Sequence, residues 1–165
     1  MGRWRAPAPS SSPYITAAGY QRLEAELGER WARRADVVKA LAAAAAEGDR
    51  SENAEYIYRK KELAGIDRRI RYLQKRLPAL TVVREAPPGE RVFFGAFIRL
   101  SRDDGTTSEY RIVGADETDA GAHCISIDSP LARALLRKSP GDTVELTLEG
   151  RVVRLAIEAV RYERC

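Results

Sequence analysis

The stretch AEGDRSENAEY, residues 46–56, interrupts a long run of helix-forming residues at Gly48. Asp49 and Glu52 stand there three positions apart, with Ser51 between them. On both sides of this stretch, apolar residues recur at steps of three, four and seven, which is the spacing of a helix that buries one face. The sequence therefore predicts two long helices, joined by a short polar bend, that pack antiparallel.

The two predicted helices form the arms of a hairpin. Thr16 is a suitable N-cap for the first arm, and Pro78 ends the second. At about 1.5 Å per residue, arms of about thirty residues would form a rod on the order of 45 Å long. The apolar positions expected to meet are Tyr20, Leu23, Leu27, Trp31, Val38, Leu41 and Ala45 in the first arm, and Tyr56, Leu63, Ile66, Ile70, Leu73 and Leu77 in the second.

The second half of the chain has the periodicity of strands, which begins after Pro87-Pro88-Gly89. Ser129-Pro130 is typical of the start of a short helix among these strands. The predicted fold class is therefore α+β, an antiparallel two-helix coiled coil followed by a small β-sheet domain with one helix. The expected strands are 92–100, 110–113, 125–128, 143–148 and 152–160. The expected boundaries are a disordered tail over 1–13, a hairpin over 14–80 with its tip at 47–53, a linker over 81–90 and a globular domain over 91–165.

Composition excludes several classes of protein. The 165 residues are 44% hydrophobic, enough for a folded core, yet no apolar run approaches the roughly 18 residues of a membrane span. The first residues have no apolar segment of the kind found in a signal peptide. Cys124, Cys165 and His123 are too few for a structural zinc site, which needs about four such ligands. A reducing, cytoplasmic compartment is expected.

The second arm carries an excess of positive charge. Residues 59–76 hold eight basic and two acidic side chains, and eight minus two leaves +6. The exterior of a coiled coil normally mixes both signs. The excess therefore favours a track for nucleic-acid phosphate, although a merely solvated face remains the alternative. The basic residues are Arg59, Lys60, Lys61, Arg68, Arg69, Arg71, Lys75 and Arg76.

The acids at the bend admit two interpretations. An acid followed three residues later by Glu is typical of a capping box, and residues 49–52 lie where the second helix should begin. Alternatively, Asp49 and Glu52 are metal ligands, because hard oxygen donors suit Mg²⁺. Two acids cannot make a complete site, so they would complete one that another molecule partly provides.

Four segments, in this order, resemble the GreB-type bacterial transcript cleavage factors of the Gre family. They are GDRSENAEY (48–56), YRKKELAGIDRRIRYLQKRL (58–77), VFFGAFIRL (92–100) and ISIDSPLARALL (125–136). The similarity runs from about Tyr14 to Tyr162, nearly the whole chain. The sister GreA type is similar to this chain to a lesser degree.

This resemblance implies a fold and a docking mode. Members of the family combine an antiparallel coiled coil with an FKBP-like C-terminal domain. By the resemblance, Asp128, Ser129 and Pro130 would dock against a coiled coil of the β′ subunit, at the mouth of the secondary channel of RNA polymerase. The hairpin would reach down that channel, with the protein acting as a monomer and without a membrane.

The resemblance also implies chemistry. Asp49 and Glu52 match the family's essential acids, which would hold Mg²⁺ jointly with the polymerase, and Ser51 between them would orient a water molecule. The chain would then not be an enzyme itself, but would stimulate the polymerase's own hydrolysis of backtracked RNA 3′ ends. The basic arm would hold the extruded nascent RNA. The residues expected to do so are Arg59, Lys60, Lys61, Arg68, Arg69 and Arg71.

Three alternatives remain. One is a transcription inhibitor on the same scaffold that blocks the channel without cleavage. Another is a prolyl isomerase with a helical appendage, but that activity needs an aromatic-lined pocket. Residues 90–165 contain only five aromatic side chains of Phe and Tyr, and no Trp. The third is a structural hairpin that binds nucleic acid through its basic arm alone.

Overall fold

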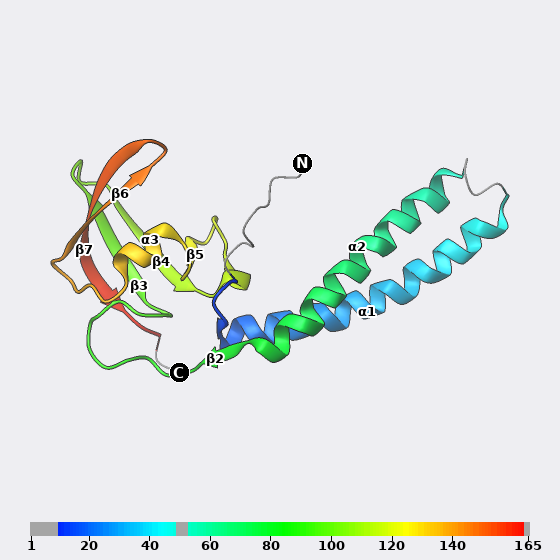
Figure 1. Ribbon diagram of the computed structural model, residues 1–165, viewed down its shortest axis with the longest axis horizontal. Helices are drawn as coiled ribbons and strands as arrows, with labels where there is room; N and C mark the ends of the chain where they lie inside the picture. Colours follow the sequence, from blue (N-terminus) through cyan, green and yellow to red (C-terminus); the bar gives the residue numbers. More distant parts are fainter. Residues whose placement is uncertain (1–9, 49–52, 164–165) are drawn as a thin grey trace, which may run out of the picture. The chain divides into compact units, whose positions relative to one another are not determined.

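The computed structural model describes residues 10–48 and 53–163 (Figure 1). Contacts divide the chain into two compact units. One unit is the segment Ala18–Leu80, and the other combines Met1–Ala17 with Thr81–Cys165. The first unit is the helical hairpin and the second contains the strands, which confirms the predicted α+β class.

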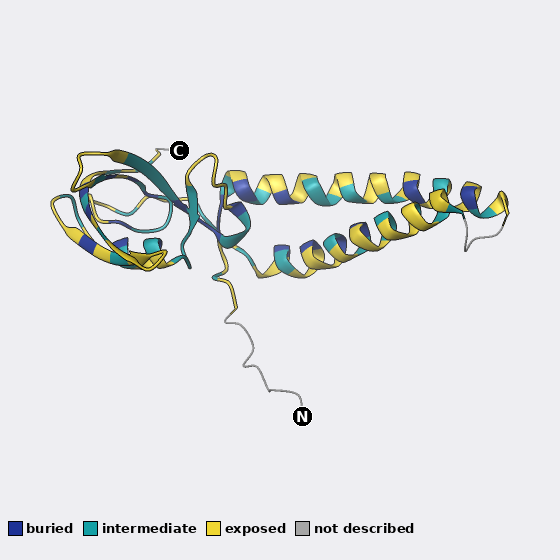
Figure 2. Ribbon diagram, turned by 90° about the horizontal axis from the view of Figure 1, so that it is seen from above, coloured by how far each residue is buried: buried dark blue, intermediate teal, exposed yellow. Residues whose placement is uncertain are grey.

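The hairpin consists of α1 (Ala17–Ala46) and α2 (Ala54–Arg76), which is followed by the short 3-10 helix η1 (Leu77–Ala79). The arms are less equal than expected, since α1 has 30 residues and α2 has 23. In Figure 2, short buried segments recur along both helices between longer exposed ones. This pattern is typical of two helices that share one narrow interface.

The buried and half-buried positions follow heptad steps in both helices. Two expected contacts of the first arm are wrong, because Trp31 is 46% exposed and Val38 is 40% exposed. The buried Val37 takes the place of Val38, and the half-buried Arg30 and Arg34 lie on either side of the place expected for Trp31. Long arginine stems can pack against apolar neighbours while their charged ends reach water. The seam positions are 23, 27, 30, 34, 37, 41 and 44 in α1, and 56, 59, 63, 66, 70, 73 and 77 in α2.

The start of the chain belongs to the second unit, so the expected domain boundaries differ from the structure. Residues Tyr14–Thr16 form strand β1, which pairs in parallel with β2 (Thr81–Val83). The backbone amide of Thr81 also donates to the carbonyl of Pro13 at 2.7 Å. The hairpin therefore does not begin at residue 14, and the first three residues of the expected linker form a strand. Residues 1–9 of the expected tail lie outside the described residues.

A five-stranded sheet with the order β5-β4-β3-β7-β6 forms the body of this unit. Neighbouring strands are antiparallel, except that β4 and β5 are parallel. The predicted hairpin around Glu149-Gly150 is confirmed, but residues 92–96 precede the strand expected there. The elements are β3 (Phe97–Arg102), β4 (Thr107–Val113), η2 (Ala115–Glu117), β5 (Cys124–Ser126), α3 (Pro130–Leu135), β6 (Thr143–Leu148) and β7 (Arg151–Arg161).

One face of this sheet and α3 enclose the core of the unit. Alternate residues of a strand point to the same face, and Ile98 and Leu100 of β3 are both buried. They pack in one cluster with Ile112 of β4, Ile157 of β7 and Leu135 of α3. The predicted helix at Ser129-Pro130 is confirmed, and its apolar side is buried in this core.

A buried carboxylate fastens β1 to the rest of the unit. Glu117 accepts hydrogen bonds from the backbone amides of Thr16 at 3.0 Å and Gly114 at 2.9 Å, and from the hydroxyl of Thr16. A Cβ atom at position 114 would lie 2.1 Å from the carbonyl oxygen of Tyr14. Only glycine therefore allows β1 to approach this closely. Thr16, predicted as the N-cap of the first helix, is thus tied to Glu117.

Candidate functional site

At the tip of the hairpin, the N-cap of α2 is a residue that was not predicted to have this role. Asn53 is the N-cap of α2, with φ −83° and ψ 101°, and its side-chain oxygen accepts a hydrogen bond from the amide of Tyr56 at 3.1 Å. The N-cap of α2 is therefore Asn53 and not Asp49, which contradicts the capping-box interpretation of the acids. Asp49, Ser51 and Glu52 themselves lie outside the described residues.

Asn53 also joins the two helices. Its side-chain amide donates to the backbone carbonyl of Ala44 at 2.8 Å, and that carbonyl accepts a second hydrogen bond from the amide of Glu47 at 3.2 Å. The carbonyl of Ala44 therefore binds both the residue that follows α1 and the residue that precedes α2. Gly48 follows with φ 135°, a backbone conformation that residues other than glycine rarely adopt. A local signal for Asn53 was present, since Asn is a preferred N-cap.

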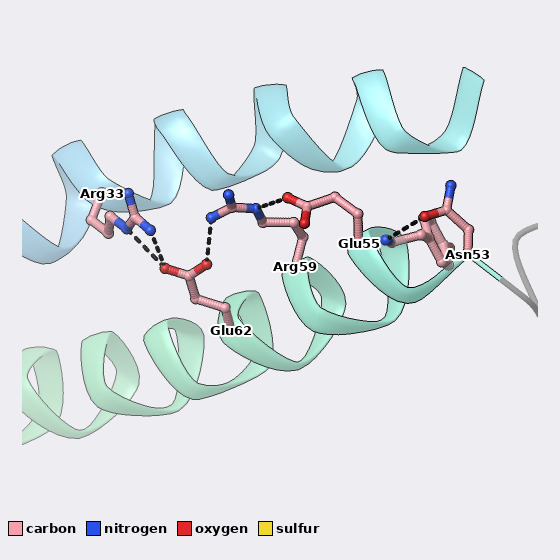
Figure 3. Close-up of polar contacts among 6 residues, drawn as sticks. Arg33, Asn53, Glu55, Arg59 and Glu62 are labelled. Carbon is pink, nitrogen blue, oxygen red and sulfur yellow. Dashed lines mark hydrogen bonds and ion pairs between the residues drawn. The ribbon is translucent and has the colours of Figure 1, made fainter. Parts of the chain in front are cut away.

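A ladder of alternating charges runs from the tip along one side of the hairpin (Figure 3). Arg33 donates to Glu62 at 2.5 and 2.8 Å, Arg59 donates to Glu62 at 3.0 Å, and Arg59 also donates to Glu55 at 2.7 Å. The hydrogen bond from Arg33 holds the pKa of Glu62 below its ordinary value. The hydrogen bond to Glu55 raises the pKa of Arg59. The ladder's contact between Arg33 and Glu62 links α1 to α2 near the middle of α1.

Two further ion pairs link the helices. Arg69 donates to both oxygens of Glu26, at 2.8 and 2.7 Å, and this contact is the main reason that the pKa of Glu26 lies below its ordinary value. Arg34 donates to Asp67 at 2.7 Å on the other side of the seam. The middle of the hairpin is therefore held by charges as well as by apolar contacts.

These contacts divide the predicted RNA-binding residues into two groups. Arg59 and Arg69 lie in ion pairs between or along the helices. In contrast, no carboxylate in the described part of the chain pairs with the four other members of the set, which are all exposed. These four are Lys60, Lys61, Arg68 and Arg71.

Two aromatic side chains accompany the exposed cations. Tyr58 is 60% exposed and Tyr72 is 42% exposed, and an arginine of the ion-paired group lies over each ring. Tyr58, Lys61, Arg68 and Tyr72 follow one another at steps of three, seven and four, so they share one face of α2. The sequence analysis counted only the charges on this arm and missed the tyrosines. Cations beside exposed rings are typical of surfaces that bind single-stranded nucleic acid.

The three residues expected to dock are consecutive at the start of α3. The carboxylate of Asp128 accepts hydrogen bonds from the amide of Ser12 at 2.8 Å and from its hydroxyl at 2.5 Å. Ser129 is the N-cap of α3, and its hydroxyl accepts from the amide of Ala132 at 3.2 Å. Pro130 is exposed at the first position of the helix. The involvement of Ser12 was not predicted.

The described part of the chain holds no other candidate centre for metal chemistry. Among residues 10–48 and 53–163, no three His, Cys, Asp or Glu side chains gather closely enough to hold a metal ion. None of the helices within those ranges has both the length and the hydropathy that a membrane span requires. The features that remain are the tip, the basic face of α2 and the corner at Asp128.

Comparison with known families identifies the chain. A family described as "Transcription elongation factor, N-terminal" matches residues 13–82, and one described as "Transcription elongation factor, GreA/GreB, C-term" matches residues 87–162. The chain belongs to the GreA/GreB family of transcription elongation factors. The first matched segment covers the hairpin, and the second covers most of the strand-rich unit of this Gre factor. Together they cover nearly the whole chain.

Individual relatives show that this Gre factor is of the GreB type. It is 56% identical over 165 residues to transcription elongation factor GreB of Xanthomonas axonopodis pv. citri (strain 306), covering 98% of each chain. It is 55% identical over 140 residues to GreB of Pseudomonas aeruginosa, covering 84% of this chain and 83% of that protein. A solved structure of the transcription factor Gfh1 is 25% identical, over 92% of this chain and 98% of that one, with a TM-score of 0.45.

Proposed function

We propose that this Gre factor enters the secondary channel of RNA polymerase and stimulates the polymerase's own Mg²⁺-dependent cleavage of backtracked RNA 3′ ends. Arrested elongation complexes would thereby resume synthesis. Membership of the GreB type supports the proposal, and one structural observation carries it. Asn53 caps α2, so Asp49 and Glu52 are not needed to start the helix. Two acids placed at the end of a slender hairpin therefore call for another role.

The proposed role of the acids is to complete a metal site. Asp49 and Glu52 supply carboxylate oxygens, the donors that Mg²⁺ prefers, and two of them fit an ion that the polymerase already holds in part. Bound Mg²⁺ would activate a water molecule for attack on the RNA phosphodiester and stabilise the leaving oxygen. Ser51, between the two acids in sequence, would orient that water. The products are a shortened RNA with a new 3′ hydroxyl and a released 3′ fragment.

The basic face of α2 would hold the extruded RNA. Lys60, Lys61, Arg68 and Arg71 are exposed and are the best placed to neutralise phosphates. Arg59 and Arg69 belong to the same proposed track, but each would have to exchange a carboxylate partner for phosphate. Their contribution is therefore expected to be smaller than that of the four exposed cations.

The corner at the start of α3 would dock on the polymerase. Asp128, Ser129 and Pro130 would contact the coiled coil of the β′ subunit at the mouth of the channel, with the protein acting as a monomer in the cytoplasm. The active centre in this proposal is that of the polymerase. The chain supplies ligands and position, and it is not an enzyme by itself.

The decisive experiment replaces both acids with amides. Asp49→Asn together with Glu52→Gln should leave folding and polymerase binding intact, because the cap of α2 comes from Asn53, and should abolish cleavage in a backtracked elongation complex. Glu47→Gln is a matched control, since Glu47 is an exposed acid beside the bend and outside the proposed pair. The Glu47→Gln variant should stimulate cleavage by the polymerase as well as the unchanged protein does.

The same assay separates the main alternative. A channel-blocking inhibitor on this scaffold would bind the polymerase and yield no shortened RNA even with the acids intact. Full cleavage by the double amide variant would contradict the proposed role of the acids. Loss of binding together with loss of cleavage would show that the acids maintain the structure of the hairpin.

A further inference from the structure

The carboxylate of Asp128 is held by a residue that is 116 positions away in the sequence. Ser12 donates its backbone amide to one carboxylate oxygen at 2.8 Å and its hydroxyl to the other at 2.5 Å. A carboxylate can accept about four hydrogen bonds, so Ser12 supplies half of that capacity. Both side chains are half-buried. Contact through both oxygens restrains the rotation of the carboxylate as well as its position.

The fold itself places Ser12 at this point. The next residue, Pro13, accepts a hydrogen bond from the amide of Thr81 at 2.7 Å, and β1 begins directly afterwards. The end of β1 is fastened in turn by the hydrogen bonds from Thr16 to Glu117. Ser12 is therefore the outer end of a short segment that is anchored along its length.

The backbone at the corner is fixed independently of Ser12. The amide of Asp128 donates to the hydroxyl of Ser126 at 3.0 Å, and the amide of Ser129 donates to the carbonyl of Ser126 at 2.9 Å. The hydroxyl of Ser129 is engaged in capping α3. The side chain of Asp128 is held in turn by Ser12 through both carboxylate oxygens.

We propose that Ser12 is a positioning residue for polymerase docking, which sets the orientation of Asp128 before the partner arrives. This inference rests on the proposed docking role of residues 128–130. A side chain that is already in its bound rotamer loses less conformational entropy on binding. The two hydrogen bonds from Ser12 also keep the carboxylate aimed in one direction. The N-terminal segment thereby contributes to affinity through Asp128.

The test measures the affinity of the full-length protein for RNA polymerase core enzyme. Ser12→Ala should weaken binding about five- to tenfold, since a hydrogen bond to a charged group is lost while the backbone amide remains. Ser12→Thr retains a hydroxyl and should bind within about twofold of the unchanged protein. Ser10→Ala is the matched control, because Ser10 is exposed and two positions earlier, and it should have no effect.

A double-mutant cycle with Asp128→Ala distinguishes positioning from a general structural role. If Ser12 acts through Asp128, Ser12→Ala should add no further loss of affinity in the Asp128→Ala background. A loss of similar size in both backgrounds would overturn the inference. Unchanged or tighter binding by Ser12→Ala, with Asp128→Ala weakened, would also overturn it, because Ser12 would then be irrelevant or a competitor.

The cycle also distinguishes failure of this inference from failure of the docking proposal on which it rests. If Asp128→Ala binds the polymerase as tightly as the unchanged protein, the docking role of Asp128 fails and the inference fails with it. If Asp128→Ala weakens binding, the docking role stands whatever Ser12→Ala does. Thermal unfolding of each variant should match that of the unchanged protein, because the contact lies at the edge of the unit and away from its apolar core.

Discussion

Asn53 at the start of α2 is hydrogen-bonded to the backbone carbonyl of Ala44 near the end of α1, at 2.8 Å. The other end of the same amide accepts from the backbone of Tyr56 at 3.1 Å. One side chain therefore caps one helix and holds the end of the other. The carboxylates proposed to reach the polymerase lie in the segment that this contact closes, so stability at the tip and position of the acids are linked.

Replacement of Asn53 tests this link. Asn53→Ala should lower the free energy of unfolding of the hairpin by about 1–2 kcal/mol, from the lost cap and the lost contact with Ala44. Urea denaturation followed by far-ultraviolet circular dichroism measures this. Asn53→Asp is the matched variant, since Asp is an equally good N-cap but has no amide to donate. Its loss should be smaller, and equal losses would show that the cap contributes nothing.

Arg59 occupies a seam position that most coiled coils give to an apolar residue. Its side chain is 25% exposed and pairs with Glu55 and Glu62. Ion pairs of this kind contribute roughly 0–1 kcal/mol, whereas an apolar side chain would pack in the seam. Arg59→Leu should therefore raise the free energy of unfolding by about 1 kcal/mol. Lys60→Leu, at the exposed neighbouring position, is the control and should change stability by less than about 0.5 kcal/mol.

The salt bridge between Glu26 and Arg69 should make the hairpin sensitive to acid. Arg69 lowers the pKa of Glu26 in the folded state from the ordinary value of 4.5. A carboxyl group whose pKa falls on folding stabilises the fold above its unfolded pKa, and this contribution is lost as the pH falls through the folded pKa. Unfolding midpoints measured from neutral pH to below 4.5 should therefore decline.

Replacing the carboxyl group should reduce that decline. Glu26→Gln cannot titrate, so its stability should vary less with pH below 4.5 than that of the unchanged protein. Glu29→Gln is the control, because Glu29 is exposed on the same helix and has no ion pair within the described residues. An identical pH profile for all three proteins would show that the Arg69 contact does not couple protonation to folding.

The exposed cations of α2 should govern the salt dependence of RNA binding. Each phosphate contact to single-stranded RNA contributes about 0.7 to the slope of the logarithm of affinity against the logarithm of salt concentration. Lys61→Gln with Arg68→Gln should therefore reduce the slope by about 1.4, measured by fluorescence anisotropy with an RNA oligonucleotide. Arg59→Gln with Arg69→Gln should change it less, because these two are engaged with carboxylates. The opposite order would assign the track to the paired arginines.

Local patterns in the sequence determined the order and type of most elements. The strands around Glu149-Gly150 and the helix at Ser129-Pro130 follow from alternation, turn residues and caps, which act over a few positions. The helical hairpin follows from heptad spacing and from the break at Gly48. The resemblance to the Gre family also rests on short motifs, and the family comparison confirms it.

Only the tertiary structure decided which side of α1 faces α2. Counting apolar residues assigned Trp31 and Val38 to the seam, but Arg30, Arg34 and Val37 lie there. An arginine is scored as polar by any hydrophobic pattern, although its stem packs well once its charge has a partner. The register of two helices depends on such pairing across the interface, and periodicity along one helix does not contain it.

The same reason explains the contacts between distant segments. The sequence by itself determined that Ser129-Pro130 begins a short helix directly after Asp128, but it assigned residues 14–16 to the hairpin and residues 81–83 to a linker. It did not determine that these two segments pair as β1 and β2, or that Ser12 binds Asp128 across 116 positions. Such contacts form because folding brings unsatisfied backbone and carboxylate groups together, and each group alone has many possible partners.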